Sequence, residues 1–426
     1  MSELEFRARV LAAIGANATE TEELLAYNRS VFERDNFKAP LQFPLQSEPH
    51  VAVWQEYVTE AKTKGTFEIL KHALVQLRFP IQAGISQTEA YRAATRKGLS
   101  PEFTSGACTP RKGIEPNQTT GLILQQPEQL QLTIHDSLVG AIPVLLTKNR
   151  EDFVSLVRAI TKRNEPVEIP DSMGACMVAG YNNWDRIRRY REGLSLEFNS
   201  GTRDDACTPR QQWSADNLDS SELAWSVEFK RLIARKELYQ DRFIILSDGF
   251  YSNVKPEKLG LTAAEWRRLS LTIRLEHECT HYFTRRVFNS MRNNLLDEFI
   301  ADYRGIVAAT GAYKADWFLR FLGLESFPHY REGGRLQNYR GQPPLSDGAF
   351  KILQKLVKVA AENLEDFERN YGERLRTIKN QTLMLMALTY LTIEELASSQ
   401  ASNLIKQAIE QLQSQTLSQV ALLEET

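Results

Sequence analysis

The sequence predicts an α+β fold in which a duplicated module precedes a mixed core and a helical subdomain follows it. Apolar residues recur at helical spacing near both ends of the chain, short apolar runs typical of strands occur in its middle, and one segment occurs there twice. Strands and helices that do not alternate regularly favour this class. We expect an N-terminal helical region, an α/β region with the repeat, a central core and a C-terminal helical subdomain, at residues 1–78, 79–215, 216–345 and 346–426.

The composition is that of an ordinary globular protein. Of 426 residues, 42% are hydrophobic and 25% are charged, and the length predicts two or three domains. A net charge of −2 without a long basic run argues against nucleic-acid binding. The longest apolar stretch, residues 383–391, is too short to span a bilayer, and the acidic opening residues do not resemble a secretory signal. Four cysteines make no disulfide framework in such a chain, so we expect a cytoplasmic protein that contacts no membrane.

The first region predicts helices interrupted by one extended segment. Apolar residues at three- and four-residue steps indicate helices within residues 4–14, 21–32 and 54–77. Residues 37–49 are rich in Pro and Gln, which predicts a linker. No combination of residues in this region suggests chemistry.

The internal repeat ends in a Cys-Thr-Pro-Arg motif. Residues 98–111 recur as residues 193–210, with a short insertion before the second motif. In each copy we expect a short helix that stops at the glycine, Gly98 or Gly193, and the first helix should start at the capping box of residues 86–89. A duplicated unit predicts two similar modules packed about a pseudo-twofold axis.

Two interpretations of the repeat remain open. In one, the paired loops form a cleft whose charged residues contact a ligand. In the other, which we favour, Glu and Arg pair within each module and the cysteines are buried and inert. The residues concerned are Glu102, Cys108, Arg111, Glu197, Cys207 and Arg210.

Short apolar runs predict the strands of the mixed region. These runs occupy residues 121–124, 130–134, 142–146 and 243–246. A helical pattern follows at residues 153–160. Residues 173–180 combine two glycines with small side chains, which predicts a loop.

The motif His-Glu-x-x-His at residues 277–281 carries the strongest chemical signal in the chain. Residues four apart share one face of a helix, so His277 and His281 can point at one metal ion. Glu278 lies where a carboxylate can accept a proton from a water that the metal activates.

A helix is expected around this motif. Thr262 and Glu265 form a capping box, and neither Gly nor Pro occurs between this point and Asn289. Apolar residues at helical spacing lead to the two histidines, which should therefore face inward.

A third metal ligand is expected on the next helix. The pair Asn293-Asn294 predicts a turn before it. Glu298 and Asp302 lie four residues apart on one face, so Glu298 can complete the metal site and Asp302 can accept a hydrogen bond from the outer nitrogen of a ligating histidine. Asp297 is a weaker candidate ligand because its partner four residues later is an alanine.

The pattern His-Glu-x-x-His followed by Glu-x-x-x-Asp resembles the gluzincin zinc metallopeptidases, of which thermolysin is the best known. The resemblance covers residues 243–311 and implies a zincin-like metallopeptidase core, a Zn²⁺ cofactor and cleavage of peptide bonds. Sixteen residues separate His281 from Glu298, slightly fewer than in thermolysin-like enzymes. The whole chain also looks like a bacterial family of uncharacterised proteins, which implies no function.

Two further roles follow from the gluzincin resemblance. A strand before the active-site helix forms one wall of the cleft in zincins, and an extended substrate pairs with it, which suggests residues 243–247. Thermolysin-like enzymes supply a His and a Tyr to the developing oxyanion from beyond the third ligand, and His329 and Tyr330 are nearest in chain order. The alternatives are a plain core strand and a surface loop.

The end of the chain predicts a helical bundle. Apolar residues within residues 350–371 form a seam for packing against other helices, and two more helices follow at residues 383–396 and 404–412. This bundle either completes the catalytic unit or forms a homodimer interface.

The function expected from the sequence is that of a zinc-dependent hydrolase acting on a peptide, with His277, His281 and Glu298 as metal ligands and Glu278 as the general base. One alternative is a metal-dependent amide hydrolase with a small substrate, for which the repeat loops should roof a closed pocket. The other is a non-catalytic binding protein in which the metal staples two helices, for which a fourth protein ligand should be present.

Overall fold

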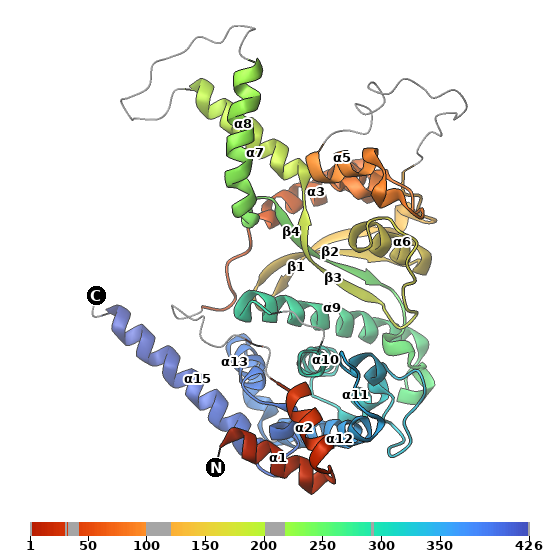
Figure 1. Cartoon of the computed structure of the whole chain (residues 1–426), viewed down its shortest axis with the longest axis vertical. Coiled ribbons are helices and arrows are strands. Elements are labelled where there is room, and N and C mark those ends of the chain that lie inside the picture. The colour runs from red at the N-terminus through yellow and green to blue at the C-terminus, as the bar shows by residue number, and fades with distance from the viewer. Residues whose placement is uncertain are drawn as a thin grey trace.

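The computed structural model describes residues 2–29, 32, 42–98, 121–200, 218–290 and 294–424. Within them a four-stranded sheet has helices on both faces, and a larger group of helices lies beyond one of these faces (Figure 1). The protein therefore has the mixed α+β fold that the sequence predicts. No helix in these ranges is both long enough and apolar enough to cross a membrane.

The sheet has the strand order β1-β2-β4-β3. Strands β2 and β4 are parallel, and the other two neighbouring pairs are antiparallel. Strand β4 is thus central, and β1 and β3 are the edges. The strands span Gln131–Ser137 (β1), Gly140–Thr147 (β2), Ala175–Asn182 (β3) and Gln240–Ser247 (β4).

Two predictions about the sheet are wrong, one of a loop and one of a strand. Residues 173–180 were expected to form a loop, but most of them belong to β3, where the register shift between Val178 and Tyr181 accommodates Gly180. Residues 121–124 lie outside the four strands. Small side chains thus occupy a real strand, because sheet pairing outweighs their weak β-propensity.

Alternate side chains of β4 enter two different hydrophobic cores. Phe243 and Ile245 pack with the helices of one face, whereas Ile244 and Leu246 pack with the helices of the other. The first face is covered by α3 (His50–Lys64), α4 (Thr66–Ala73) and α6 (Arg150–Thr161), and the second by α9 (Ala263–Phe288). Because both faces are buried, the run of residues 243–246 is uniformly apolar.

A group of eight further helices in the described ranges lies on the far side of α9 from the sheet (Figure 1). They are α1 (Glu3–Ile14), α2 (Ala18–Tyr27), α10 (Leu295–Thr310), α11 (Ala315–Leu322), α12 (Asp347–Tyr371), α13 (Ile378–Thr389), α14 (Ile393–Leu396) and α15 (Ala401–Glu424). Short 3₁₀ helices lie at Val75–Arg78, Ile85–Gln87, Pro127–Gln129, Lys236–Leu238, Tyr251–Asn253, Pro256–Leu259, Arg335–Tyr339 and Gly372–Leu375.

The expected N-terminal region does not form one packing unit. Helices α1 and α2 pack on α12, and the buried Arg7 of α1 forms an ion pair with Glu394 of α14. Helices α3 and α4 instead cover the sheet. The predicted seam of α12, which includes Leu353, Val357 and Leu364, is buried against other helices of this chain. It is therefore part of the hydrophobic core.

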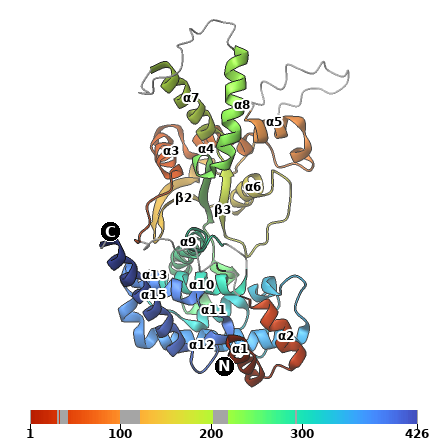
Figure 2. The same ribbon diagram turned by 60° about the vertical axis from the view of Figure 1, so that its left-hand side comes forward.

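The two copies of the repeat differ in the part that the structure describes. Helix α5 (Glu89–Lys97) stops at Gly98 as predicted, although its cap is Thr88 rather than the expected residue 86. Helix α7 (Trp184–Ser200) continues through Gly193, and it packs against α8 (Leu218–Ala234), with which it projects from the sheet (Figure 2). The Cys-Thr-Pro-Arg motifs and their neighbours, with Glu102, Cys108, Arg111, Cys207 and Arg210, lie outside the described residues, as does the side chain of Glu197.

Candidate metal centre

Local signals fix the ends of the two helices that carry the centre. The side chain of Thr262 accepts a hydrogen bond from the backbone of Glu265 at the start of α9, and Asn289 ends this helix with a φ of +50°. Helix α10 starts where the side chain of Asn294 accepts a hydrogen bond from the backbone N–H of Asp297. The two sharp ends explain how sixteen residues suffice to connect His281 to Glu298.

The two helices run antiparallel and approach closely. His281 contacts Asp297 of α10, and His277, one turn earlier on α9, contacts Asp302, which lies later on α10. A further turn back, α9 meets Gly305, where an added Cβ would lie 2.8 Å from the carbonyl oxygen of Ile273. The absent side chain at residue 305 therefore lets α10 lie against the histidine face of α9.

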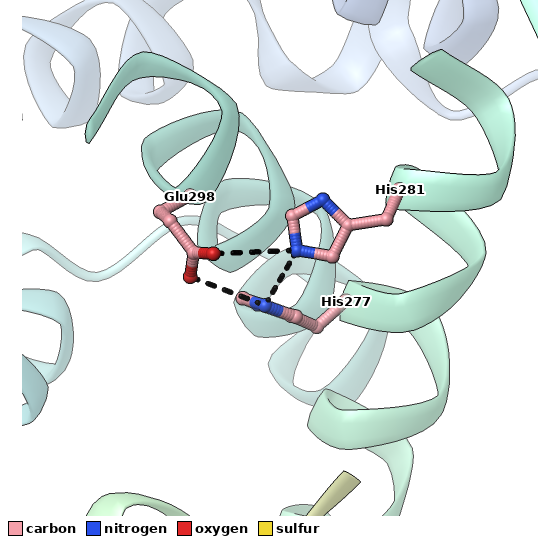
Figure 3. Close-up of side chains that lie close together, drawn as sticks. All are labelled: His277, His281 and Glu298. Atoms are coloured by element: carbon pink, nitrogen blue, oxygen red, sulfur yellow. Dashed lines mark hydrogen bonds and ion pairs between the residues drawn. The ribbon is translucent and has the colours of Figure 1, made fainter. Parts of the chain in front are cut away.

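His277, His281 and Glu298 converge (Figure 3). The Nε2 atoms of the two histidines are 3.1 Å apart, and they lie 3.4 Å and 3.5 Å from the two carboxylate oxygens of Glu298. Donor atoms that bind a tetrahedral ion at about 2.0–2.1 Å lie about 3.3 Å from one another. The spacing of the three side chains therefore fits a small tetrahedral cation.

A carboxylate behind each histidine fixes its tautomer. Nδ1 of His277 donates to Asp302 at 2.9 Å, and Nδ1 of His281 donates to Asp297 at 3.2 Å. In the neutral rings this leaves a lone pair on each Nε2. Two lone pairs 3.1 Å apart repel each other unless a positive charge lies between them.

The pKa shifts also indicate a site that accepts positive charge. Burial lowers the pKa of His277 and His281, but hydrogen bonds and negative charge from the surrounding carboxylates outweigh it, so both pKa values are raised. Burial raises the pKa of Glu298, but the two histidines outweigh it and hold this pKa well below its ordinary value. The third candidate ligand, Glu298, is therefore an anion.

Two side chains that the sequence analysis did not identify hold Asp302. The hydroxyl of Tyr251 donates to one of its oxygens at 2.5 Å, and the guanidinium of Arg335 binds the other. Arg335 also donates to the Tyr251 hydroxyl at 2.9 Å. Both come from short 3₁₀ helices far from the motif, and no local pattern marks them. Asp297, which the sequence analysis considered only as a weaker ligand, instead orients His281. An antiparallel pairing of the two helices would have predicted this contact.

The three candidate ligands line a pocket of about 470 Å³. Glu278, which is 8% exposed, lines this pocket together with residues 174–177 from the start of β3. Burial, with a contribution from the charge of Glu278, raises the pKa of the Cys176 thiol to about 12. The predicted general base and the predicted metal ligands therefore share one cavity.

The two predicted oxyanion donors do not line this pocket. His329 is exposed, and the Tyr330 hydroxyl donates to the carbonyl of Gly334 while its ring packs on Phe350. Tyr339 lines the pocket instead. The order of residues along the chain did not identify the donor, because the loop turns back at residues 330–334. The 3₁₀ helix Arg335–Tyr339, which follows this turn, reaches the pocket instead.

The strand predicted to receive substrate is also corrected. Residues 243–247 lie in β4, whose two sides are already hydrogen-bonded to β2 and β3. An added strand needs a free edge. Among the described strands, β3 is the edge nearest to α9 and its first residues line the pocket.

Comparison with known proteins gives one match. A family model with the description "Family of unknown function (DUF7005)" matches residues 9–400. No curated protein and no solved structure matches the chain. The family description names no activity, and these comparisons lend no support to the gluzincin resemblance of residues 243–311. The protein belongs to this family of unknown function.

Proposed function

We propose that the protein is a zinc-dependent hydrolase with a zincin-like centre and that it cleaves peptide bonds. One observation carries the proposal: three donors with tetrahedral spacing share a pocket with the carboxylate of Glu278, and the described residues contribute no fourth ligand. Structural zinc sites are closed by four protein ligands, whereas catalytic sites keep one position open. The donor set therefore favours a catalytic centre over a structural staple.

The residues have separate roles in this proposal. His277, His281 and Glu298 hold the ion, and Asp297 and Asp302 orient the two histidines. A bound zinc ion supplies Lewis-acid polarisation of the scissile carbonyl and lowers the pKa of a water. Glu278 takes the proton of the attacking water and delivers it to the leaving amine.

Tyr339 is the proposed donor to the oxyanion. Burial, the charge of Glu298 and a hydrogen bond with Glu298 raise the pKa of Tyr339 well above its ordinary value. Its hydroxyl therefore remains protonated at neutral pH and can donate to the negative charge that develops on the carbonyl oxygen. Tyr339 takes the role that the sequence assigned to His329 and Tyr330.

Strand β3 supports a peptide as the substrate. An extended peptide can add to a sheet edge through its main chain, and residues 174–177 of this edge line the pocket beside Glu278. The pocket volume of about 470 Å³ is also typical of small-molecule sites, so a small amide is the second candidate substrate.

Metal analysis combined with Glu278→Gln tests the proposal. We expect about one zinc per chain in the wild type and in the variant, because Glu278 is not a ligand. Hydrolysis of a broad peptide library should fall by about 10²–10⁴-fold in the variant only. Glu257→Gln, at an exposed glutamate just before the same helix, is the matched control and should retain full activity.

Two outcomes contradict the proposal in different ways. A wild-type protein that is purified with zinc supplied and still holds none shows that the centre is not a zinc site. A zinc-loaded protein whose activity is unchanged by Glu278→Gln shows that the metal serves binding or structure rather than hydrolysis.

A further inference from the structure

Arg274 lies in the same pocket, one helical turn before His277. It is only 5% exposed. One terminal nitrogen donates to the carbonyl oxygens of Ser247 and Gly249, and the other donates to that of Phe250 at 2.8 Å. Among the described residues, the hydrogen-bond acceptors of this guanidinium are therefore all neutral carbonyl groups, and its only other close partner is the face of the Tyr251 ring, 5.9 Å away.

Within the described ranges, no carboxylate lies at ion-pair distance from Arg274. The negative charge of Asp248 acts on Arg274 from beyond ion-pair distance. One carboxylate oxygen of Asp248 lies 3.8 Å from Nε of Arg267. Burial lowers the pKa of Arg274 to about 10. A buried cation whose charge is not neutralised is unfavourable in the free protein and is available to an anionic ligand.

A second arginine, Arg150, lies behind this end of the pocket without lining it, and its charge acts on Arg274. Arg150 donates to the carbonyl oxygens of Pro170 and Met173, two residues that line the cavity, and it too has no ion pair among the described residues. The opposite end holds the carboxylates around the metal ligands. Among the charged side chains that line the pocket, Arg274 thus lies at one end and the carboxylates lie toward the metal-binding end.

A glycine makes room at the Arg274 guanidinium. A Cβ added to Gly174 would lie 2.3 Å from Nε and 2.5 Å from one terminal nitrogen. Gly174 itself lines the pocket at the start of β3. Any larger residue there would displace the guanidinium, so Gly174 and Arg274 together define this end of the pocket.

We propose that Arg274 binds a carboxylate of the substrate, which makes the protein a hydrolase of anionic peptides or amides. The inference rests on the proposed function. One helical turn is about 5 Å along the axis, so the carboxylate should lie within one or two residues of the bond that is cleaved. Arginine is the side chain best suited to carboxylate recognition in a buried site. The carboxylate belongs either to a free C-terminus or to an acidic side chain.

Binding of small hydroxamates to the zinc-loaded protein tests this inference without measuring hydrolysis. The probes are acetohydroxamate, the monohydroxamate of succinate and its neutral primary-amide analogue, each titrated by calorimetry. The anionic probe should bind about 10–100-fold more tightly than its neutral analogue, as expected for a charged hydrogen bond. This preference should be lost in Arg274→Met and in Gly174→Ala, whereas Arg268→Met, at an exposed arginine of α9, should retain it.

The outcomes separate this inference from the proposed function. Equal affinity of the wild type for the anionic and neutral succinate probes overturns the role of Arg274 but leaves the metal centre intact. If acetohydroxamate also fails to bind and no zinc is present, the proposed function itself is wrong. If Arg274→Met does not fold, the wild-type preference and Gly174→Ala decide the matter, because that variant keeps the arginine.

A competition experiment then identifies the source of the carboxylate. Trialanine, trialanine amide and acetyl-alanyl-aspartyl amide are used to displace the anionic probe. Displacement by trialanine alone assigns the site to a free C-terminus, and displacement by the aspartyl peptide assigns it to an acidic side chain. Equal displacement by trialanine and its amide, with none by the aspartyl peptide, contradicts carboxylate recognition.

Discussion

Asp302→Asn tests whether the carboxylate behind His277 prepares it to bind metal. Asp302 is fully buried and accepts hydrogen bonds from His277, Tyr251 and Arg335. Asparagine keeps the shape of the Asp302 side chain but removes its negative charge. Its NH₂ group also faces one of the three neighbours, His277, Tyr251 or Arg335, which are themselves donors. The substitution therefore loosens the histidine and leaves the buried guanidinium without its counter-ion.

The structure predicts two separable magnitudes. Removal of one partner from a buried ion pair destabilises a protein by about 3–5 kcal/mol. Arg335 is itself mostly buried, with a side chain that is 12% exposed, so the full range applies. Loss of the group that orients a ligating histidine lowers metal affinity by about 10–100-fold.

Zinc competition with a chromogenic chelator measures the affinity, and urea unfolding of the metal-free protein measures the stability. Asp316→Asn is the control, because Asp316 is exposed and its ion pair with the partly buried Arg320 should contribute about 0–1 kcal/mol. If Asp302→Asn unfolds more easily but binds zinc as tightly as the wild type, Asp302 has a structural role only. If neither quantity changes, the reasoning from the hydrogen-bond network is wrong.

Three further predictions test the centre and the fold. In the metal-free protein, the raised pKa values of His277 and His281 contribute stability that is present below pH 6.5 and is lost as the pH rises through the folded-state values, so the urea midpoint should fall toward alkaline pH; a rise would contradict the shift. Gly305→Ala places a Cβ against the Ile273 carbonyl, and it should lower the unfolding free energy by about 1–3 kcal/mol and weaken zinc binding; unchanged chelator competition would refute the close approach. Asp241→Asn removes the buried partner of an arginine on the far face of the sheet, and it should destabilise the protein by about 3–5 kcal/mol in urea unfolding without changing zinc affinity.

Much of the centre could be predicted from the sequence because its signals are local. The capping box at Thr262 starts α9, and the four-residue spacing of His277 and His281 places both on one face whatever surrounds the helix. The same reasoning on α10 identified Glu298 and the role of Asp302. Each inference depends on residues within one or two helical turns, where backbone geometry alone fixes which side chains are neighbours.

The orienting and supporting residues depend on contacts between distant segments. Tyr251 and Arg335 reach Asp302 from 3₁₀ helices on opposite sides of the motif in the sequence, and no periodicity relates them. Asp297 could be assigned to His281 only once the two helices were known to be antiparallel. Relative placement of this kind follows from packing of the whole chain rather than from spacing.

The sequence by itself determined the α+β class, the two helices of the centre and the set of three candidate metal ligands, because helix periodicity and capping act within a few residues. Only the tertiary structure decided which strand is an edge and which loop reaches the pocket. Strand order depends on pairing between remote segments, so β3, whose small residues resemble a loop, became the wall beside Glu278, and the apolar β4 became the centre of the sheet.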